Sequence, residues 1–189
     1  MVMAAAGQTA AASRVAACRS AAEERIEREL LILTRHREMR APRGPRGGDP
    51  LDQSAYVLLT RLEAQGPMSI PDFVEAFGLA ASTFTRQTSA LLRNGLVERT
   101  LDPDGGVARK FRITEGGLRL LTEQREGIVT GLSTVVSDWT PERLDRFITD
   151  LRQFNTDIER ITGRPWPRTA NDTDHADPTA LSAAAPDHD

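Results

Sequence analysis

Apolar residues recur at helical spacing along most of the chain, and this pattern predicts most of its elements. A first helix is expected over about residues 19–39, where Ile26, Leu30 and Leu33 fall on one face. The next segment, APRGPRGGDP, ends that helix, because proline and glycine are poorly tolerated in helix interiors. A second helix is expected over about residues 52–64, until a Gly-Pro pair stops it.

Two short helices joined by a turn, and then a hairpin, are predicted over residues 69–114. Ser69 is the expected N-cap of the first helix, with Asp72 near its positive end. Gly78 makes the turn to the second helix, over about residues 81–94. The inward face of this second helix is expected to hold Phe84, Thr88 and Leu91. Because DPDGG is a strong turn sequence between two strand-like stretches, the order is that of a winged helix-turn-helix, whose second helix fits the DNA major groove.

Two long helices follow the hairpin. Thr114 caps the first, and Thr140 with Pro141 marks the start of the second. Their apolar residues alternate three and four positions apart, which is typical of helices that pack on other helices. These stripes comprise Leu118, Leu121, Ile128, Leu132 and Val135, and then Leu144, Ile148, Leu151 and Ile158. Arg125 interrupts the first stripe; it is expected to pair with an acid across a dimer or to face a ligand pocket, and we favour a structural role.

The expected fold class is mainly α with a small β-wing: a winged helix-turn-helix plus a helical dimerisation bundle. The 189 residues suit one such domain with tails. We expect a disordered N-terminal arm over 1–18, a dimerisation helix over 19–40, a winged helix-turn-helix DNA-binding lobe over 51–113, two dimerisation helices over 114–163, and a disordered acidic tail over 164–189.

Charge is distributed unevenly along the chain. The net charge of −3 argues against indiscriminate binding of nucleic acid. Between residues 80 and 112, however, six basic and three acidic residues give a local charge of +3. The residues after Arg168 include five aspartates and no Lys or Arg, and so carry −5. The negative net charge of the chain therefore comes from its acidic tail, although residues 80–112 are locally basic.

The second helix of the motif has a polar face without acids, which suits an approach to phosphates. Arg86 is the best candidate for a base contact, because a guanidinium can pair with guanine; phosphate binding is the alternative. Arg93 is expected to bind a phosphate, and Arg99 to support the wing by pairing with Asp102 or Asp104. The expected DNA-binding residues are Ser82, Thr83, Thr85, Arg86, Gln87, Ser89, Arg93, Arg109 and Lys110.

Other chemistries have little support in the sequence. No nucleophile elbow, phosphate loop or metal-ligand spacing is present, so we expect neither an enzyme nor a cofactor. Cys18 is the single cysteine, and a redox-sensing role would depend on its exposure and pKa. His36 has no companion ligand. Because no apolar run is long enough to span a bilayer and no leader is evident, we expect a cytoplasmic protein without a membrane partner. A winged-helix module that binds protein is the main alternative.

The order and spacing of these motifs resemble the MarR family of bacterial transcription regulators over about residues 19–163. The most specific parts are Gly95, Leu96, Val97 and Arg99, the Asp102-Pro103 wing, and Ile113-Thr114 with Gly117. The resemblance implies a homodimer that binds double-stranded DNA at a pseudo-palindromic operator and represses transcription by blocking promoter access. It also implies a pocket for a small aromatic or lipophilic effector, between the DNA-binding lobe and the dimer helices.

The sequence departs from the family pattern in two places. The family wing usually has Asp-Arg-Arg at its tip, where this chain has Gly105, Gly106 and Val107, so Arg109 and Lys110 are the candidates to replace the missing arginine. Before the recognition helix, an alanine at position 80 stands in place of the usual serine-type cap, which removes one capping hydrogen bond.

Overall fold

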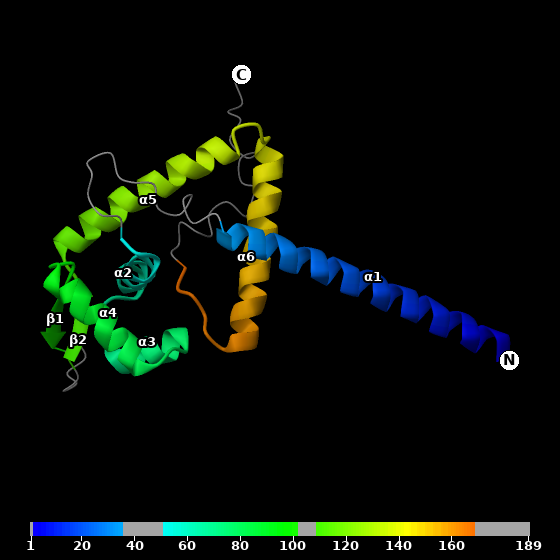
Figure 1. The fold of residues 1–189 in the computed structure, drawn as a ribbon, viewed down its shortest axis with the longest axis horizontal. Helices are drawn as coiled ribbons and strands as arrows, with labels where there is room; N and C mark the ends of the chain where they lie inside the picture. Colours follow the sequence, from blue (N-terminus) through cyan, green and yellow to red (C-terminus); the bar gives the residue numbers. More distant parts are fainter. Residues whose placement is uncertain (1, 36–50, 102–108, 169–189) are drawn as a thin grey trace, which may run out of the picture. The chain divides into compact units, whose positions relative to one another are not determined.

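The structure is a computed structural model, and it describes residues 2–35, 51–101 and 109–168 (Figure 1). The elements are α1 (Val2–Arg35), α2 (Gln53–Gln65), α3 (Ile70–Phe77), α4 (Ala81–Arg93), β1 (Val97–Leu101), β2 (Arg109–Ile113), α5 (Glu115–Val135) and α6 (Pro141–Thr162). The described residues are mainly helical and include a two-stranded antiparallel sheet, so the predicted fold class is confirmed. It divides into two compact units, residues 1–40 and 41–189.

The first unit is the helix α1, which begins earlier than the sequence pattern predicts. We expected a disordered arm over 1–18, but the helix already starts at Val2. The arm is rich in alanine, which has the highest helix propensity, and a search for apolar stripes does not detect such a helix. From residue 18 to residue 35 every residue is exposed, including Leu31 at 58% and Leu33 at 49%. His36 lies outside the described residues.

The second unit contains the winged lobe, which we define as residues 51–101 and 109–121. Within it α3 packs on α4, α4 on β1, and α2 on both α5 and β2. Phe73 is fully buried and its ring stacks on that of Phe84, with the centroids 5.5 Å apart. Truncating such a phenylalanine to alanine typically costs about 3–5 kcal/mol, so this stack is a main support of the lobe. The core consists of Leu51, Leu58, Leu59, Leu62, Met68, Phe73, Phe84, Leu91, Val97, Phe111 and Leu121.

Local capping fixes the helices of the lobe. The Ser69 hydroxyl accepts from the Asp72 amide (3.3 Å), which confirms the predicted N-cap, and the Asp72 carboxylate accepts from the Ser69 amide (2.8 Å). The Thr114 hydroxyl accepts from the Gly117 amide (3.0 Å) and donates to a carbonyl in the turn after α4 (2.7 Å). A Cβ on Gly117 would lie 2.2 Å from the Leu96 carbonyl oxygen, so only glycine allows α5 to start this close to that turn.

The sheet pairs Val97 with Ile113 and Glu98 with Arg112. Arg112 donates twice to the Glu98 carboxylate, from Nε at 3.0 Å and from Nη2 at 2.5 Å. A backbone bridge from Met68 adds a third chain segment beside β2, which the sequence pattern does not predict. The wing tip, residues 102–108, lies outside the described residues.

The two long helices leave much apolar surface uncovered. Leu121 is fully buried in the lobe, but further along α5 Leu132 is 47% exposed. On α6, Ile148 is 51% and Leu151 44% exposed. None of the described helices combines the length and the apolar composition that crossing a membrane requires.

Arg125 forms an ion pair with an acidic residue of the same chain. Its guanidinium forms a two-pronged ion pair with Glu63 of α2, with Nη1 3.2 Å from Oε1. The hydrogen bond to that carboxylate is also the main reason why the pKa of Arg125 lies above its usual value. The acid that pairs with Arg125 thus lies in the same chain, because α2 and α5 pack directly on one another and bring the two charges together. The structural role that we favoured agrees with this contact.

Candidate nucleic-acid interface

The orientation of α4 is fixed by the residues that it buries. Phe84, Thr88 and Leu91 are each at most 3% exposed, as predicted. The Thr88 hydroxyl would be costly to bury unpaired, and it donates to the Phe84 carbonyl at 2.7 Å. Because these three residues hold one face of the helix in the core, the opposite face must point outward.

The outward face of α4 carries the polar residues predicted to meet DNA. The exposed members are Ser82, Thr85, Arg86 and Arg93, and the half-buried ones are Thr83, Gln87 and Ser89. The Thr85 hydroxyl donates to the Ala81 carbonyl (2.9 Å), and the Ser89 hydroxyl to the Thr85 carbonyl (2.7 Å). Since a hydroxyl has one proton, these two side chains offer lone pairs outward, which suits amino groups on base edges better than phosphates.

Two arginines of α4 keep their positive charge available. Within the described part of the chain, neither Arg86 nor Arg93 forms an ion pair with an acid. Both are exposed, and they lie seven positions apart on the same side of the helix. This spacing places one guanidinium in the second turn of α4 and the other at its C-terminal end.

The start of α4 is open as well. Ala80 has the backbone conformation of an N-cap (φ −64°, ψ 143°), but no side chain caps the helix. The other helices of the second unit have side-chain caps, each of which accepts a backbone hydrogen bond. These caps are Asp52, Ser69, Thr114 and Thr140. Apart from the Thr83 amide, which donates to the Ala80 carbonyl, the first-turn amides of α4 have no side-chain cap, and helix N-termini of this kind favour an anion such as a phosphate.

The wing separates the two residues that were predicted to act together. Arg109 and Lys110 are neighbours in β2, and successive side chains of a strand point to opposite faces. Arg109 therefore lies on the face of the buried Phe111, at the far end of the strand, and Lys110 on the opposite face. Arg99 is exposed in β1, while its expected partners Asp102 and Asp104 lie outside the described residues.

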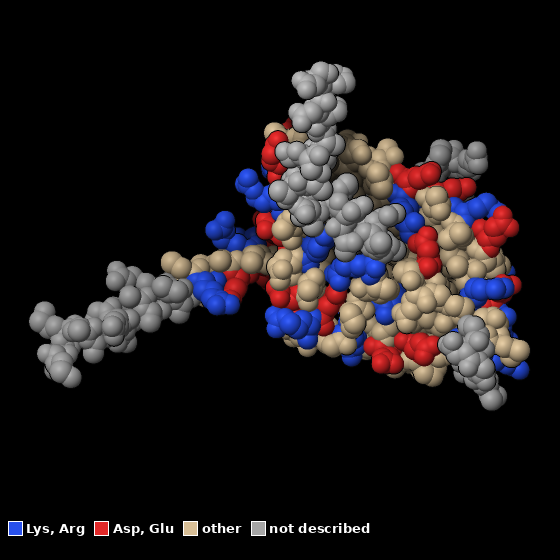
Figure 2. Space-filling view, turned by 180° about the vertical axis from the view of Figure 1, so that it is seen from behind, with Lys and Arg blue, Asp and Glu red and all other residues tan. Residues whose placement is uncertain are grey.

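Figure 2 shows one whole face of the molecule coloured by charge. Basic and acidic side chains are interspersed over this face, without one continuous basic area. On this face, therefore, the basic side chains form no broad positive area that could attract nucleic acid.

The sequence analysis missed a cluster that connects the lobe to the end of the chain. Residues 164–168 were predicted to belong to a disordered tail, but they pack on the lobe. The Trp166 ring lies edge-on against Phe77, with centroids 6.0 Å apart, and Arg61 donates from Nη1 to the Pro165 carbonyl at 3.0 Å. The tryptophan between two prolines was the one available indication, because a large aromatic residue is unusual in a polar tail. Residues 169–189 lie outside the described residues.

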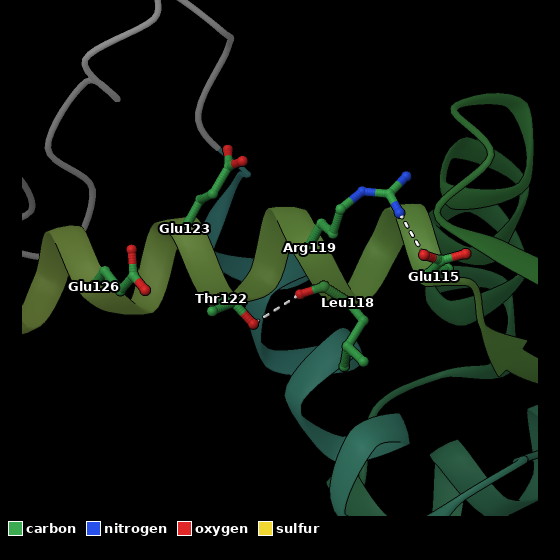
Figure 3. Close-up of a pocket in the computed structure, with 6 residues that line it drawn as sticks. All are labelled: Glu115, Leu118, Arg119, Thr122, Glu123 and Glu126. Atoms are coloured by element: carbon green, nitrogen blue, oxygen red, sulfur yellow. Dashed lines mark hydrogen bonds and ion pairs between the residues drawn. The ribbon is translucent and has the colours of Figure 1, made fainter.

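An open hollow of about 300 Å³ lies on the surface of α5 (Figure 3). It is lined by Glu115, Leu118, Arg119, Thr122, Glu123 and Glu126. Arg119 donates to the Glu115 carboxylate at 2.9 Å, and the Thr122 hydroxyl donates within its own helix at 3.0 Å. Figure 3 shows that all six side chains come from α5 alone. Because this hollow is lined by three carboxylates and is formed by a single helix, it does not suit an aromatic or lipophilic effector.

Metal chemistry has no evident site in the described ranges. They contain no group of three or more His, Cys, Asp or Glu residues that could hold a metal ion. Cys18 is an exposed free thiol on α1.

Comparison with known proteins gives a consistent result. Residues 51–105 match the MarR family. The chain is 30% identical, over 132 residues, to the uncharacterized HTH-type transcriptional regulator YxaD of Bacillus subtilis (strain 168), covering 70% of this chain and 92% of that protein. A MarR family protein from Bacillus stearothermophilus has a similar structure, with a TM-score of 0.60, 26% identity and coverage of 74% and 96%. A MarR-like regulator from Thermotoga maritima shares the fold, with a TM-score of 0.52, 20% identity and coverage of 73% and 95%.

Proposed function

The chain belongs to the MarR family, and from this premise we propose that it is a dimeric repressor that binds a pseudo-palindromic operator. As a family member it is a DNA-binding regulator of transcription and not an enzyme. Binding of the dimer across a promoter would exclude the polymerase, so repression follows from occupancy alone. The observation that best supports the proposal is the exposed, acid-free face of α4, held outward by three buried residues.

We propose distinct roles for the residues of this face. Arg86, in the second turn of α4, is assigned to a base edge in the major groove, where a bidentate contact is worth about 1–3 kcal/mol of discrimination. Arg93, at the C-terminal end, is assigned to a phosphate. The remaining polar residues complete the contact surface, with Ser82, Thr83, Thr85, Gln87 and Ser89 on α4 and Arg109 and Lys110 on the wing.

We propose that a second copy of the chain covers the apolar residues of the long helices. Val129, Leu132 and Val135 on α5 are 47–55% exposed, and Ile148 and Leu151 on α6 are similarly open. Completing the burial of each aliphatic side chain would contribute on the order of 1 kcal/mol, so several together can offset the cost of association. A two-fold arrangement would present both recognition helices to one side of the DNA, with half-sites about 10 bp apart.

We also propose that a small aromatic or lipophilic effector lowers the affinity for DNA. The support is the family relation, together with the apolar surface of the long helices next to the lobe. Titrating candidate aromatic acids against the operator complex would show release of DNA if the proposal holds, and unchanged affinity across a broad panel would count against it.

The test of DNA binding starts from selection of sequences out of a randomised duplex library. Arg86→Ala should weaken binding to the selected operator roughly 5- to 150-fold, and binding to random DNA much less. Arg19→Ala removes another exposed guanidinium, outside the winged lobe on α1, and serves as the control. Equal losses on both DNAs would assign Arg86 to a phosphate, and a wild-type protein with no salt-dependent binding would favour the protein-interaction module instead.

A further inference from the structure

The chain returns to the winged lobe after its last helix. We call residues 164–168 the C-terminal strap. Gly163 ends α6 in the left-handed conformation (φ +67°), and this turns the chain back toward α3 (Figure 1). Trp166 then meets Phe77 at an interplanar angle of 69°, the edge-to-face geometry that aromatic rings favour. The strap therefore docks on the end of α3, next to the turn that leads into the recognition helix.

A buried arginine lies under the strap. Arg61 of α2 is only 7% exposed, and its Cζ lies 5.1 Å from the centre of the Trp166 ring and 6.0 Å from that of Phe77. Its Nε donates to Gln65 at 2.7 Å, and its Nη1 donates to the strap backbone. Burial lowers the pKa of Arg61, and the nearby Glu159 carboxylate opposes that effect. A guanidinium in this position needs its partners, and the strap supplies two of them, a carbonyl and an aromatic face.

The strap is also tied to the helix that it leaves. Arg168 donates to both oxygens of Glu159, at 2.7 and 2.8 Å, and this carboxylate is only 17% exposed. The guanidinium of Arg164 lies so close to Gly78, in the turn between α3 and α4, that a Cβ there would be 2.4 Å from its Cζ. One end of α6 is thus connected to the helix-turn-helix itself.

The other end of α6 is held at its junction with α5. Trp139 and Phe147 meet edge-on with centroids 5.4 Å apart, and Arg143 lies over the Trp139 ring at 4.0 Å. Between these two ends α6 is not among the helices that pack extensively on the lobe, as far as the described residues show. Its angle to the recognition helix therefore depends on the aromatic junction at one end and on the strap at the other.

We propose that the C-terminal strap sets the distance between the two recognition helices, with Trp166 and Arg61 as positioning residues that determine the half-site spacing. This inference rests on the proposed function, because it requires that α6 form part of the interface with the partner subunit. A docked strap fixes the lobe against α6, so the dimer accepts one spacing. A released strap lets the lobe pivot, so the dimer tolerates several spacings and loses its higher affinity at the preferred one.

The decisive experiment measures affinity for operators whose half-sites are moved apart or together by one and two base pairs. The wild type should prefer one spacing strongly. Loss of an edge-to-face pair and a cation–π contact should reduce the affinity of Trp166→Ala at that spacing by roughly tenfold. At the other spacings its affinity should change little, so its profile becomes flat. Trp166→Phe keeps a ring and should restore most of the preference.

Two controls separate positioning from general damage. Light scattering should show that Trp166→Ala remains a dimer, and its melting temperature should stay near that of the wild type. In a Trp139→Phe background Trp166 is the only tryptophan, so its quenching by acrylamide reports strap docking without DNA. A well-shielded Trp166 supports the inference, and a freely quenched one overturns it.

The outcomes distinguish this inference from the proposed function. If the wild type has a spacing preference that Trp166→Ala retains, or if Trp166→Ala loses affinity equally at every spacing, the strap does not set the distance. If the wild type binds no DNA, the proposed function fails and this inference fails with it, even where quenching shows a docked strap.

Discussion

Replacing Ala80 with serine should stabilise the winged lobe. Ala80 already has the extended backbone of an N-cap, at φ −64° and ψ 143°, so the substitution requires no rearrangement. A serine cap is typically worth about 0.5–2 kcal/mol relative to alanine. The Thr83 amide already donates to the Ala80 carbonyl at 3.0 Å, so the new hydroxyl shares a satisfied donor. We therefore expect the lower part of the range, about 0.5–1 kcal/mol, or an increase of roughly 1–4 °C in melting temperature for a chain of this size.

Ala81→Ser is the matched control for this substitution. It adds the same hydroxyl one position later, inside the first turn of α4, where serine is a slightly poorer helix former than alanine. Thermal and urea unfolding followed by circular dichroism would compare the two variants with the wild type. If Ala80→Ser unfolds at or below the wild-type temperature, or if both variants change equally, the missing cap is not what limits α4.

Three further outcomes are expected. Arg109→Ala should lower the slope of the dependence of log affinity on log salt by about 0.9, and an unchanged slope would show that β2 does not meet a phosphate. Ile148→Asp should convert the dimer to monomers and abolish tight operator binding, as measured by light scattering and gel shift, because it puts a charge into an apolar interface. The hydrogen bond from Arg168 is the main reason why the pKa of Glu159 lies below its usual value, so strap docking should be complete at neutral pH and lost as pH falls through that lowered pKa. Quenching of Trp166 in the Trp139→Phe background should show this acid transition, and Glu159→Gln should lack it.

The winged lobe could be predicted because its determinants are local. Ser69 with Asp72, three positions apart, defines a helix start, and the structure contains the complete capping box. Phe84, Thr88 and Leu91 repeat at helical spacing, and this alone fixes which side of α4 is buried. Such patterns lie within one or two helical turns, so a single sequence contains them in full.

The strap could not be predicted, because its contacts join distant parts of the chain. Arg61 and Pro165 are 104 positions apart, and neither belongs to a periodic apolar pattern. Trp166 lies in a proline-rich segment that composition alone assigns to a tail. The bridge between Met68 and Phe111 is also long-range, and it depends on backbone pairing that side-chain patterns do not reveal.

The buried residues of this protein lie in the winged lobe, whereas the apolar residues of α6 are left for association. The core of the lobe draws on every element from α2 to the first half of α5, and Leu121 is the last fully buried residue of that series. Beyond it, α6 contributes no buried residue. Substitutions in the lobe core should therefore act on the free energy of unfolding, and those on α6 on association. Within the described part of the second unit, α5 and the strap connect α6 to the lobe, and the strap residue Arg164 lies against Gly78 in the turn before α4. From the proposed role of the strap we expect a change at Trp166 to alter operator choice while folding and dimerisation stay intact.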